Sequence, residues 1–274
     1  PAVEPYLNVF ILHSYLHDVN PIPAEQSVQD WIRAANYSAT KSRNLWMSET
    51  SGYATDSWTG AMELAAFMHT SLKHGKIAGW VYYVTSQLHD AGVPNGLWYA
   101  SKHYYHFVRP GAVMVECIDD NDQGIFATAF DHPAQGSFTV VVLNSSASSR
   151  EIALSGAGLP SQFDVYRSTV AQGCENVGTL ASGSSVTVPA SSITTFYAGS
   201  SSPVRARPPV DASALTVLAP QANKPRSMFT VSGQRVRLAA SPLSRPAAGT
   251  YVVMPGTNGG APRTVQQLRG HTIR

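Results

Sequence analysis

The stretch "RNLWMSET", residues 43–50, decides the fold prediction because it joins a short apolar segment to a single carboxylate. Residues 45–47, Leu-Trp-Met, are typical of a buried strand. The sequence turns polar directly after them, and Glu49 is followed by a Gly-containing turn over 50–52. A carboxylate at the end of a buried parallel strand occupies the position where β/α proteins place catalytic groups. An acid that caps or ion-pairs with the next helix fits the same residues, and the residues alone leave both interpretations open.

Apolar strands alternate with helices on both sides of this stretch. Continuous apolar runs over 6–16 and 77–86 predict strands buried on both faces, as in a parallel sheet. End signals and three- to four-residue periodicity predict helices over 23–35, 55–75 and 98–108. The alternation predicts parallel β/α units over residues 1–111.

The pattern changes after residue 111. Short alternating strands separated by turn residues predict an antiparallel β-sandwich over 112–198. A Ser/Pro-rich segment predicts a linker over 199–226, and a small β tail is predicted over 227–274. The predicted fold class is therefore α/β plus all-β.

Charge is distributed unevenly along the chain. Residues 1–199 carry 9 Lys and Arg against 16 Asp and Glu, whereas 200–274 carry 10 against one. The basic residues of the tail are scattered and have few aromatic neighbours, so we expect a solvated tail and no nucleic-acid partner. No run of about 18 apolar residues occurs, so we expect no membrane span.

Composition bears on the compartment. Only 13% of the 274 residues are charged, and 21 Gly and 18 Pro give a loop-rich profile that resembles secreted proteins. The sequence opens without Met and without a basic-then-apolar leader, so we expect it not to be an intact precursor. Cys117 and Cys174 lack metal-site spacing, and either one disulfide or two reduced thiols fits them. We expect no metal and no cofactor.

The ends of the three predicted strands carry groups suited to sugar chemistry. His13 and Tyr15 follow the first strand, Glu49 ends the second, and Trp80 and Tyr82 lie in the third. The carboxyl ends of parallel strands meet at one edge, so we expect these side chains to gather there. A carboxylate that attacks an anomeric carbon, beside flat aromatic rings, suits glycoside hydrolysis.

These residues resemble a known family. "LWMSET" resembles the Trp-Met-Thr-Glu nucleophile strand of glycoside hydrolase family 30. Further resemblances to that family are "HSY" (13–15), "GWVYYVTS" (79–86), the Phe-x-Arg-Pro-Gly signature in "SKHYYHFVRPGAVMV" (101–115) and "VPASSITTFYAG" (188–199). Together they cover about residues 6–198.

The resemblance implies a (β/α)8 barrel with a side β-sandwich, of which this chain contains strands six to eight. It implies a secreted or cell-surface bacterial enzyme that cleaves a β-linked plant polysaccharide with retention of the anomeric configuration. Xylan is the first substrate that the resemblance implies. Glu49 is the implied nucleophile, and the implied acid/base belongs to barrel units absent from this sequence. We interpret Glu4 as a loop residue, so this polypeptide alone is expected to be inactive. A family 30 glucosidase or glucanase is an alternative.

Roles for the remaining site residues also come from the resemblance. His13 and Tyr15 are expected to hydrogen-bond Glu49 or the sugar, and Trp80 is expected to form a wall of the sugar subsite. A structural histidine at position 13 and a core tryptophan at position 80 are the alternatives.

Two other assignments follow from position along the chain. Tyr82 and Tyr83 point in opposite directions on a strand, so only one faces the cleft, and Tyr82 is placed in the substrate-binding set. Trp46 and Met47 are assigned to the core, and Arg109 to the turn between the domains.

Two features complicate the resemblance. The loop over 85–103 contains no Arg, so a bidentate clamp for a glucuronate carboxylate is not evident, and Lys102 or His89 are the substitutes at hand. The segments at 228–236 and 246–256 resemble a bacterial secretion-sorting domain, which implies secretion machinery as a partner; a generic β-hairpin is the alternative.

A non-catalytic carbohydrate-binding β-module on a truncated barrel is the competing function.

Overall fold

The computed structural model describes residues 6–15, 25–120 and 123–199 and four short strands beyond them. Residues 1–220 form one compact unit, and residues 221–274 form a second. Glu4 lies outside the described residues, as does most of the predicted tail.

Three parallel strands form the first sheet, in the order β1-β2-β3. Their bounds are Val9–His13 (β1), Asn44–Glu49 (β2) and Gly79–Trp80 (β3). A helix follows each strand: Glu25–Thr40 (α1), Trp58–Gly75 (α2) and Gly96–Tyr105 (α3). The predicted alternation of parallel strands and helices is confirmed for these residues.

The third strand is shorter than predicted. Regular pairing ends at Trp80, and the chain continues through a 3-10 turn, Thr85–Leu88 (η2), and a small hairpin of His89–Asp90 (β4) and Val93–Pro94 (β5). The backbone still follows β2 after Trp80, because Tyr83 N–H donates to the Thr50 carbonyl at 2.9 Å.

The boundaries of the helices follow from local hydrogen bonds. The Ser57 hydroxyl accepts a hydrogen bond from Gly60 N–H and caps α2, and Lys76 ends that helix in a left-handed conformation. At α3 the Asn95 side chain accepts from the backbone N–H groups of Leu97 and Trp98. These caps fix where α2 and α3 begin.

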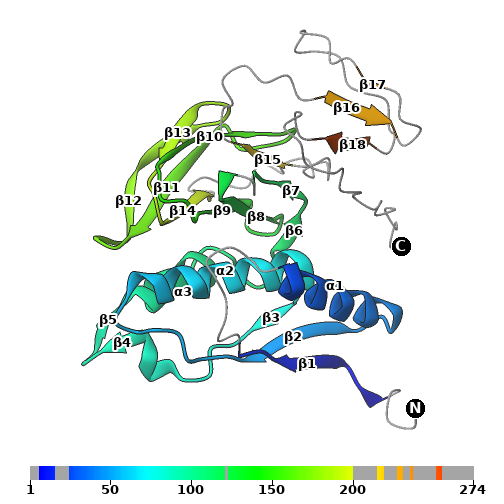
Figure 1. The fold of residues 1–274 in the computed structure, drawn as a ribbon, viewed down its shortest axis with the longest axis vertical. Coiled ribbons are helices and arrows are strands. Elements are labelled where there is room, and N and C mark those ends of the chain that lie inside the picture. Colours follow the sequence, from blue (N-terminus) through cyan, green and yellow to red (C-terminus); the bar gives the residue numbers. More distant parts are fainter. Residues whose placement is uncertain are drawn as a thin grey trace. The chain divides into compact units, whose positions relative to one another are not determined.

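The helices cover one face of the parallel sheet (Figure 1). Leu45 and Met47 of β2 point to that face and are buried in one core with α2. The opposite face leaves Ile11, Trp46 and Val81 exposed. The core assignment of Met47 is therefore confirmed, whereas that of Trp46, which is 43% exposed, is wrong because strand alternation turns its side chain to the uncovered face.

Two sheets form the predicted antiparallel β-sandwich. The larger has six strands in the order β12-β11-β14-β9-β8-β6. Their bounds are Val113–Val115 (β6), Ile125–His132 (β8), Ser137–Asn144 (β9), Gln162–Thr169 (β11), Gln172–Ala181 (β12) and Ser192–Ala198 (β14). The smaller sheet has the order β13-β10-β15-β7, with bounds Cys117–Ile118 (β7), Arg150–Ser155 (β10), Ser185–Val188 (β13) and Leu215–Leu218 (β15).

One of these strands lies in a segment predicted to be a linker. β15 pairs antiparallel with β10 and parallel with β7, between residues 199 and 226. Farther along, Ser227–Thr230 (β16), Arg235–Val236 (β17) and Tyr251–Met254 (β18) form a separate three-stranded antiparallel sheet. The sorting role expected of the tail falls largely on residues outside those described.

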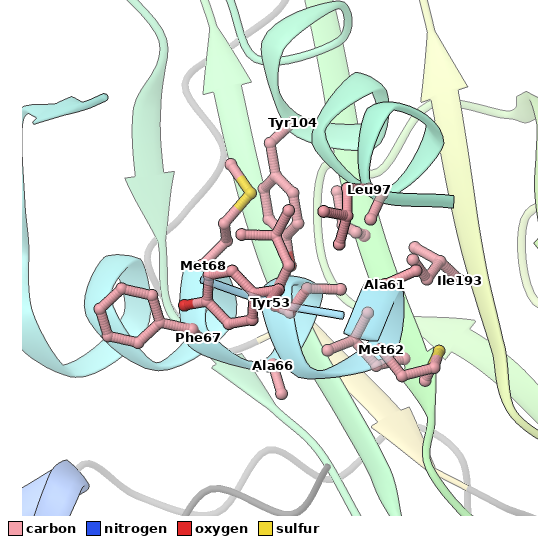
Figure 2. Close-up of a cluster of buried hydrophobic side chains, with 14 of the residues drawn as sticks. Tyr53, Ala61, Met62, Ala66, Phe67, Met68, Leu97, Tyr104 and Ile193 are labelled. Carbon is pink, nitrogen blue, oxygen red and sulfur yellow. The ribbon is translucent and has the colours of Figure 1, made fainter. Parts of the chain in front are cut away.

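One hydrophobic core is shared by the sandwich and the helices, and a second lies within the sandwich, around Phe138 and Phe163. Figure 2 shows Ala61 of α2 and Leu97 and Tyr104 of α3 in the same cluster as Ile193 of β14. Strands β8 and β9 contribute Phe126, Val141 and Leu143 to it. The sandwich is therefore packed on the helices through buried apolar side chains.

Buried polar groups reinforce this junction. The His103 ring on α3 lies 2.7 Å from Thr195 Oγ1 and 2.8 Å from Ser168 Oγ, and burial lowers the pKa of His103 to about 3. Lys73 of α2 forms an ion pair with Asp119, with 2.5 Å between Nζ and Oδ2. Both contacts join a helix to a sandwich strand or loop, so separation of the two parts leaves buried polar groups unpaired.

The cysteines are two separate buried thiols. Both are free. Burial raises the pKa of Cys117 to about 12 and that of Cys174 to about 11, so both remain protonated at neutral pH. Of the two alternatives left open by the sequence, the structure contains the reduced pair.

The shared core predicts that a sandwich mutation destabilises the helical part. We expect Ile193→Ala to lower the free energy of unfolding by about 2–5 kcal/mol, because it removes a fully buried side chain. All five Trp residues precede residue 111, but Trp58 Nε1 donates to the carbonyl of Ser191 beside β14, so the variants are compared in a Trp58→Phe background. The fluorescence of the other four Trp residues during urea unfolding then reports on the helical part.

The exposed Val170 is the matched control, and Val170→Ala is expected to leave the midpoint unchanged. An unchanged tryptophan transition in Ile193→Ala, with a separate loss of β-sheet circular dichroism, would contradict the shared core.

Candidate functional site

A β-bulge lies at the end of β2. Leu12 pairs with Met47, but the next residue of β1, His13, pairs with Glu49, so Ser48 is the extra residue. The third strand follows the same irregularity, because Val81 N–H donates to the Met47 carbonyl and Tyr83 N–H to the Thr50 carbonyl. Bulges of this kind redirect the side chain that follows them.

The bulge determines where the Glu49 carboxylate lies. Without it, Glu49 would share the face of Met47, two residues before it, and point into the buried core under the helices. Instead Glu49 is in register with His13, which shares the uncovered face with Ile11 and Trp46. The Glu49 side chain is 25% exposed there, so it is partly sheltered and still open to a ligand.

Two side chains of the first strand's end hold this carboxylate. The Tyr15 hydroxyl donates a hydrogen bond to Glu49 Oε1. His13 Nδ1 lies 3.5 Å from Glu49 Oε2. The backbone is tied as well, since Ser14 N–H donates to the Glu49 carbonyl at 3.1 Å. The structure therefore brings together the three residues that the sequence placed at two strand ends.

The electrostatics of the cluster keep Tyr15 protonated. The hydrogen bond to Glu49 is the largest cause that raises the pKa of Tyr15 to about 12, followed by burial and by the charges of Glu49 and Tyr83. Loss of the phenolic proton would place two negative oxygens against each other. Tyr15 therefore remains a hydrogen-bond donor to Glu49 throughout the neutral pH range.

The two adjacent tyrosines of the third strand have opposite environments. Tyr82 is buried, donates a hydrogen bond to Gln87 Oε1 at 2.9 Å, and has its pKa raised to about 12 by burial. Tyr83 is 62% exposed and interacts electrostatically with Tyr15. The prediction that Tyr82 contacts the substrate is therefore wrong, because its side chain points to the covered face. Tyr83 is the tyrosine on the same face as Glu49.

Trp80 has the structural environment named as its alternative. Its ring meets Phe67 of α2 edge-on, with 6.0 Å between centroids. Its Nε1 donates to Ser71 Oγ, also on α2, at 3.2 Å. The indole therefore points to the covered face and does not form the expected wall beside Glu49.

The cationic candidates lie on the last helix and the hairpin before it. Arg109 Nη1 donates to the Tyr105 carbonyl at 2.9 Å, so it closes the last turn of α3. Lys102 lies on α3 and His89 on β4. None of these three is on an element that ends beside Glu49, so a carboxylate clamp at Glu49 made from them is not supported.

A second carboxylate beside Glu49 is not found in the described part of the chain. Glu63 lies on α2, where burial raises its pKa and its charge acts on Tyr53. Across residues 6–15, 25–120 and 123–199, no group of His, Cys, Asp or Glu side chains could hold a metal ion. The chemistry available at the site is that of one carboxylate with two hydrogen-bonding neighbours.

Sequence reasoning missed the bulge and the role of Tyr83. The alternation of Tyr82 and Tyr83 indicated that one of them faces the cleft, but it could not say which one. The pairing of Trp80 with Met47 decides the matter, because it puts Trp80 and Tyr82 on the covered face and Tyr83 on the opposite one. This register between two strands cannot be deduced from the sequence of either strand. The residues around Ser48 carry no glycine or proline that would mark a bulge.

Comparisons with known proteins agree with this architecture. Residues 111–196 match the family model of the glycosyl hydrolase family 30 beta sandwich domain. No curated protein matches the sequence. None of the helices in the described residues combines the length and apolar character that a membrane crossing requires.

Several solved structures are similar to the chain. A family 30 endoxylanase from Clostridium papyrosolvens C71 has 19% sequence identity and a TM-score of 0.57, over 70% of this chain and 49% of that one. A conserved exported protein from Bacteroides fragilis has 16% identity and a TM-score of 0.55, over 69% and 46% of the two chains. A bifunctional glucanase-xylanase protein from a metagenome library has 18% identity and a TM-score of 0.54, over 71% and 44%.

The chain thus spans just under half the length of these structures. At this identity the structural likeness establishes the fold. The match over residues 111–196 confirms the predicted resemblance to family 30 for the sandwich.

The contact between Tyr15 and Glu49 predicts a titration that the Glu49 charge controls. In the unaltered chain we expect Tyr15 to stay protonated to about pH 11, because its pKa is raised to about 12. Glu49→Gln replaces the charged acceptor by a neutral amide, so the Tyr15 pKa is expected to fall toward the ordinary value of about 10. Carbon-13 NMR of labelled tyrosine, assigned with Tyr15→Phe, measures both.

Glu63→Gln serves as the matched control, since Glu63 acts on Tyr53 and not on Tyr15. An ordinary Tyr15 pKa in the unaltered chain, unaffected by Glu49→Gln, would show that the contact does not exist in solution.

Proposed function

We propose that this chain is part of a retaining glycoside hydrolase that cleaves a β-linked plant polysaccharide, with xylan as the first candidate and Glu49 as the nucleophile. The observation that carries the proposal is the Glu49 carboxylate, which is turned by a bulge onto the uncovered face of a parallel sheet and hydrogen-bonded there by Tyr15. This geometry goes beyond what a helix-capping acid needs.

The geometry supports a nucleophile in three ways. The position at the carboxyl end of a parallel strand leaves one side of the carboxylate open to a ligand. The hydrogen bond from Tyr15 holds Oε1, and Oε2, which lies 3.5 Å from His13 Nδ1, is the oxygen proposed to attack an anomeric carbon. In that step the new bond forms between a Glu49 oxygen and the anomeric carbon, while the leaving oxygen departs with the electron pair of the broken bond.

Aromatic side chains near Glu49 suit a sugar. Tyr83 is exposed on the same face, and its backbone N–H donates to the carbonyl of Thr50, the residue after Glu49. Trp46 precedes Glu49 on the same strand and is exposed on that face too. Flat rings of this kind pack against the apolar faces of pyranose sugars.

The reaction also needs a second carboxyl group. Retaining hydrolysis uses two, about 5–5.5 Å apart, and the second protonates the leaving oxygen and later activates water. We place this acid/base in the part of the fold that this chain, at just under half the length of its structural relatives, does not span. A strand that ends in Asn-Glu, in a longer form of the protein, is the feature expected there.

The choice of substrate rests on similarity. One similar structure is named an endoxylanase and another a bifunctional glucanase-xylanase, so both xylan and a β-glucan are compatible with the fold. A secreted enzyme fits such polymers, and one similar structure is named an exported protein. We keep xylan as the first substrate to test.

A free-standing carbohydrate-binding module is less well supported. Strands β8, β9 and β14 bury side chains in the same core as α2 and α3. The sandwich also has a core of its own between its two sheets, but a module that acts alone needs a boundary that few contacts cross. The sandwich therefore fits a support for the catalytic sheet better than an independent binding domain.

The proposed nucleophile can be tested without the missing acid. A 2-deoxy-2-fluoro-xylobioside with a dinitrophenolate leaving group needs no proton, so residues 1–274 are expected to form an ester on Glu49. Trypsin cleavage after Arg43 and Lys73 gives a peptide that contains both Glu49 and Glu63, and fragment mass spectra locate the label. Glu49→Gln should abolish labelling, while Glu63→Gln should leave it unchanged. A label at any other residue would overturn the assignment of Glu49.

A second test concerns the natural polymer. Residues 1–274 are expected to release no sugar from xylan, because a general acid contributes roughly 10²–10⁴-fold and unactivated glycosides depend on it. Reducing-sugar release over hours, with the fluorosugar-labelled chain as the blank, measures this. Steady hydrolysis would contradict the proposal that the acid/base lies outside this chain. Glu4, Asp18 and Glu63 would then be the acid/base candidates to test.

A further inference from the structure

Three strands of the sandwich each carry a buried polar atom that has no hydrogen-bond partner in the described part of the chain. The atoms are Nε of Arg150 on β10, Nε of Arg167 on β11 and Oγ1 of Thr194 on β14. Thr194 is fully buried. Buried polar groups of native proteins are almost always hydrogen-bonded, so three unpartnered atoms in one domain need an explanation. None of them belongs to the Glu49 cluster, so they do not depend on the proposed function.

The strand register directs all three side chains into the space between the two sheets. Arg150 pairs with Val188, and Arg167 pairs with Thr194. Directly paired residues of antiparallel strands point to the same face. Val188 belongs to the core between the sheets, so Arg150 points inward as well. Arg167 follows Val165 of the same core by two residues, so Arg167 and Thr194 also point inward.

The two arginines meet at one end of β13. Arg167 crosses from the larger sheet to the smaller one, because its Nη2 donates to the Thr187 carbonyl at 3.1 Å. Thr187 precedes Val188, the strand partner of Arg150. Asn144 holds this end in place, since its Nδ2 donates to the Val188 carbonyl at 3.2 Å. The unpartnered donors therefore gather at a fixed end of the sandwich.

The positive charge at this end has no counter-ion among the described residues. No Asp or Glu of these residues forms an ion pair with either arginine. Glu151 follows Arg150 and so points to the opposite face of its strand. Glu175 pairs with Arg167 in register, but it is exposed on the edge strand β12. Partial burial lowers the pKa of Arg167, because its charge is incompletely solvated.

We propose that this end of the sandwich binds a tetrahedral oxyanion, phosphate or sulfate. The Nε–H groups of Arg150 and Arg167 and the Thr194 hydroxyl are donors on three different strands. A tetrahedral oxyanion presents oxygens in three directions at once, whereas a carboxylate presents two in one plane. The anion neutralises the two arginines and joins β10 of the smaller sheet to β11 and β14 of the larger one. Its role is to hold the two sheets together.

The first test measures binding. Equilibrium dialysis of residues 1–274 against radiolabelled phosphate in low-salt buffer is expected to give one phosphate per chain, displaced by sulfate but not by acetate at the same concentration. Arg150→Met and Arg167→Met should each weaken binding at least about tenfold, because each removes a charge-assisted hydrogen bond. Arg33→Met is the matched control and should leave binding unchanged, since Arg33 pairs with Asp30 on α1. Circular dichroism checks that each variant is folded.

The second test uses the buried hydroxyl and measures stability in urea. Without phosphate, Thr194→Val is expected to be at least as stable as the unaltered chain, because a methyl group replaces an unpartnered buried hydroxyl of the same shape. Added phosphate stabilises the unaltered chain by mass action and should stabilise Thr194→Val less. Phosphate also stabilises proteins by exclusion from their surfaces, and Arg33→Met, measured beside them, should keep the full response of the unaltered chain.

A third variant should change the affinity in the opposite direction. Glu175→Gln removes the acid paired with Arg167 and is expected to tighten phosphate binding by about two- to fivefold, the range for an exposed charge.

Three results would overturn the site. The first is the absence of saturable phosphate binding, and the second is a loss in Arg150→Met no larger than that in Arg33→Met. The third is a Thr194→Val chain that is less stable than the unaltered one without phosphate and equally stabilised by phosphate. That result would assign the hydroxyl to a buried water.

Discussion

The one extra residue in the second strand is the constraint on which the proposed site depends. Regular pairing would send the carboxylate of Glu49 into the core beneath α2, where an unpaired charge is strongly unfavourable. The bulge at Ser48 instead brings Glu49 into register with His13 and within reach of the Tyr15 hydroxyl. Because Tyr83 lies on the same face, a single backbone irregularity places a carboxylate, a phenol, an imidazole and an exposed ring together.

The sandwich matters to this site through the helices. The second helix packs against the covered face of the sheet, with Met47 in the shared core, and against sandwich residues such as Ile193. Polar contacts made by His103 and Lys73 tie the same helices to sandwich elements. A rigid layer therefore supports β2 from behind, which is what a catalytic group at a strand end requires to keep its geometry.

Much of this architecture could be predicted from local sequence signals. The apolar run before Glu49 and the periodic helix after it gave the parallel units, and short alternating strands gave the sandwich. Long-range pairing could not be predicted: β15 occupies a segment with linker composition, because its partners lie far away in the sequence. The same limit explains Trp46 and Trp80, since hydrophobicity indicates burial but only the register says which face of the sheet has a covering layer.

The measurement that tests the account most directly is a crystal structure of residues 1–274 after reaction with the fluorinated xylobioside. The account predicts continuous density from a Glu49 carboxyl oxygen to the anomeric carbon, with the Tyr15 hydroxyl beside that carboxyl group and Ser48 still outside the regular pairing. Density for the sugar at another side chain, or a regular second strand that directs Glu49 toward Met47 and α2, would contradict it.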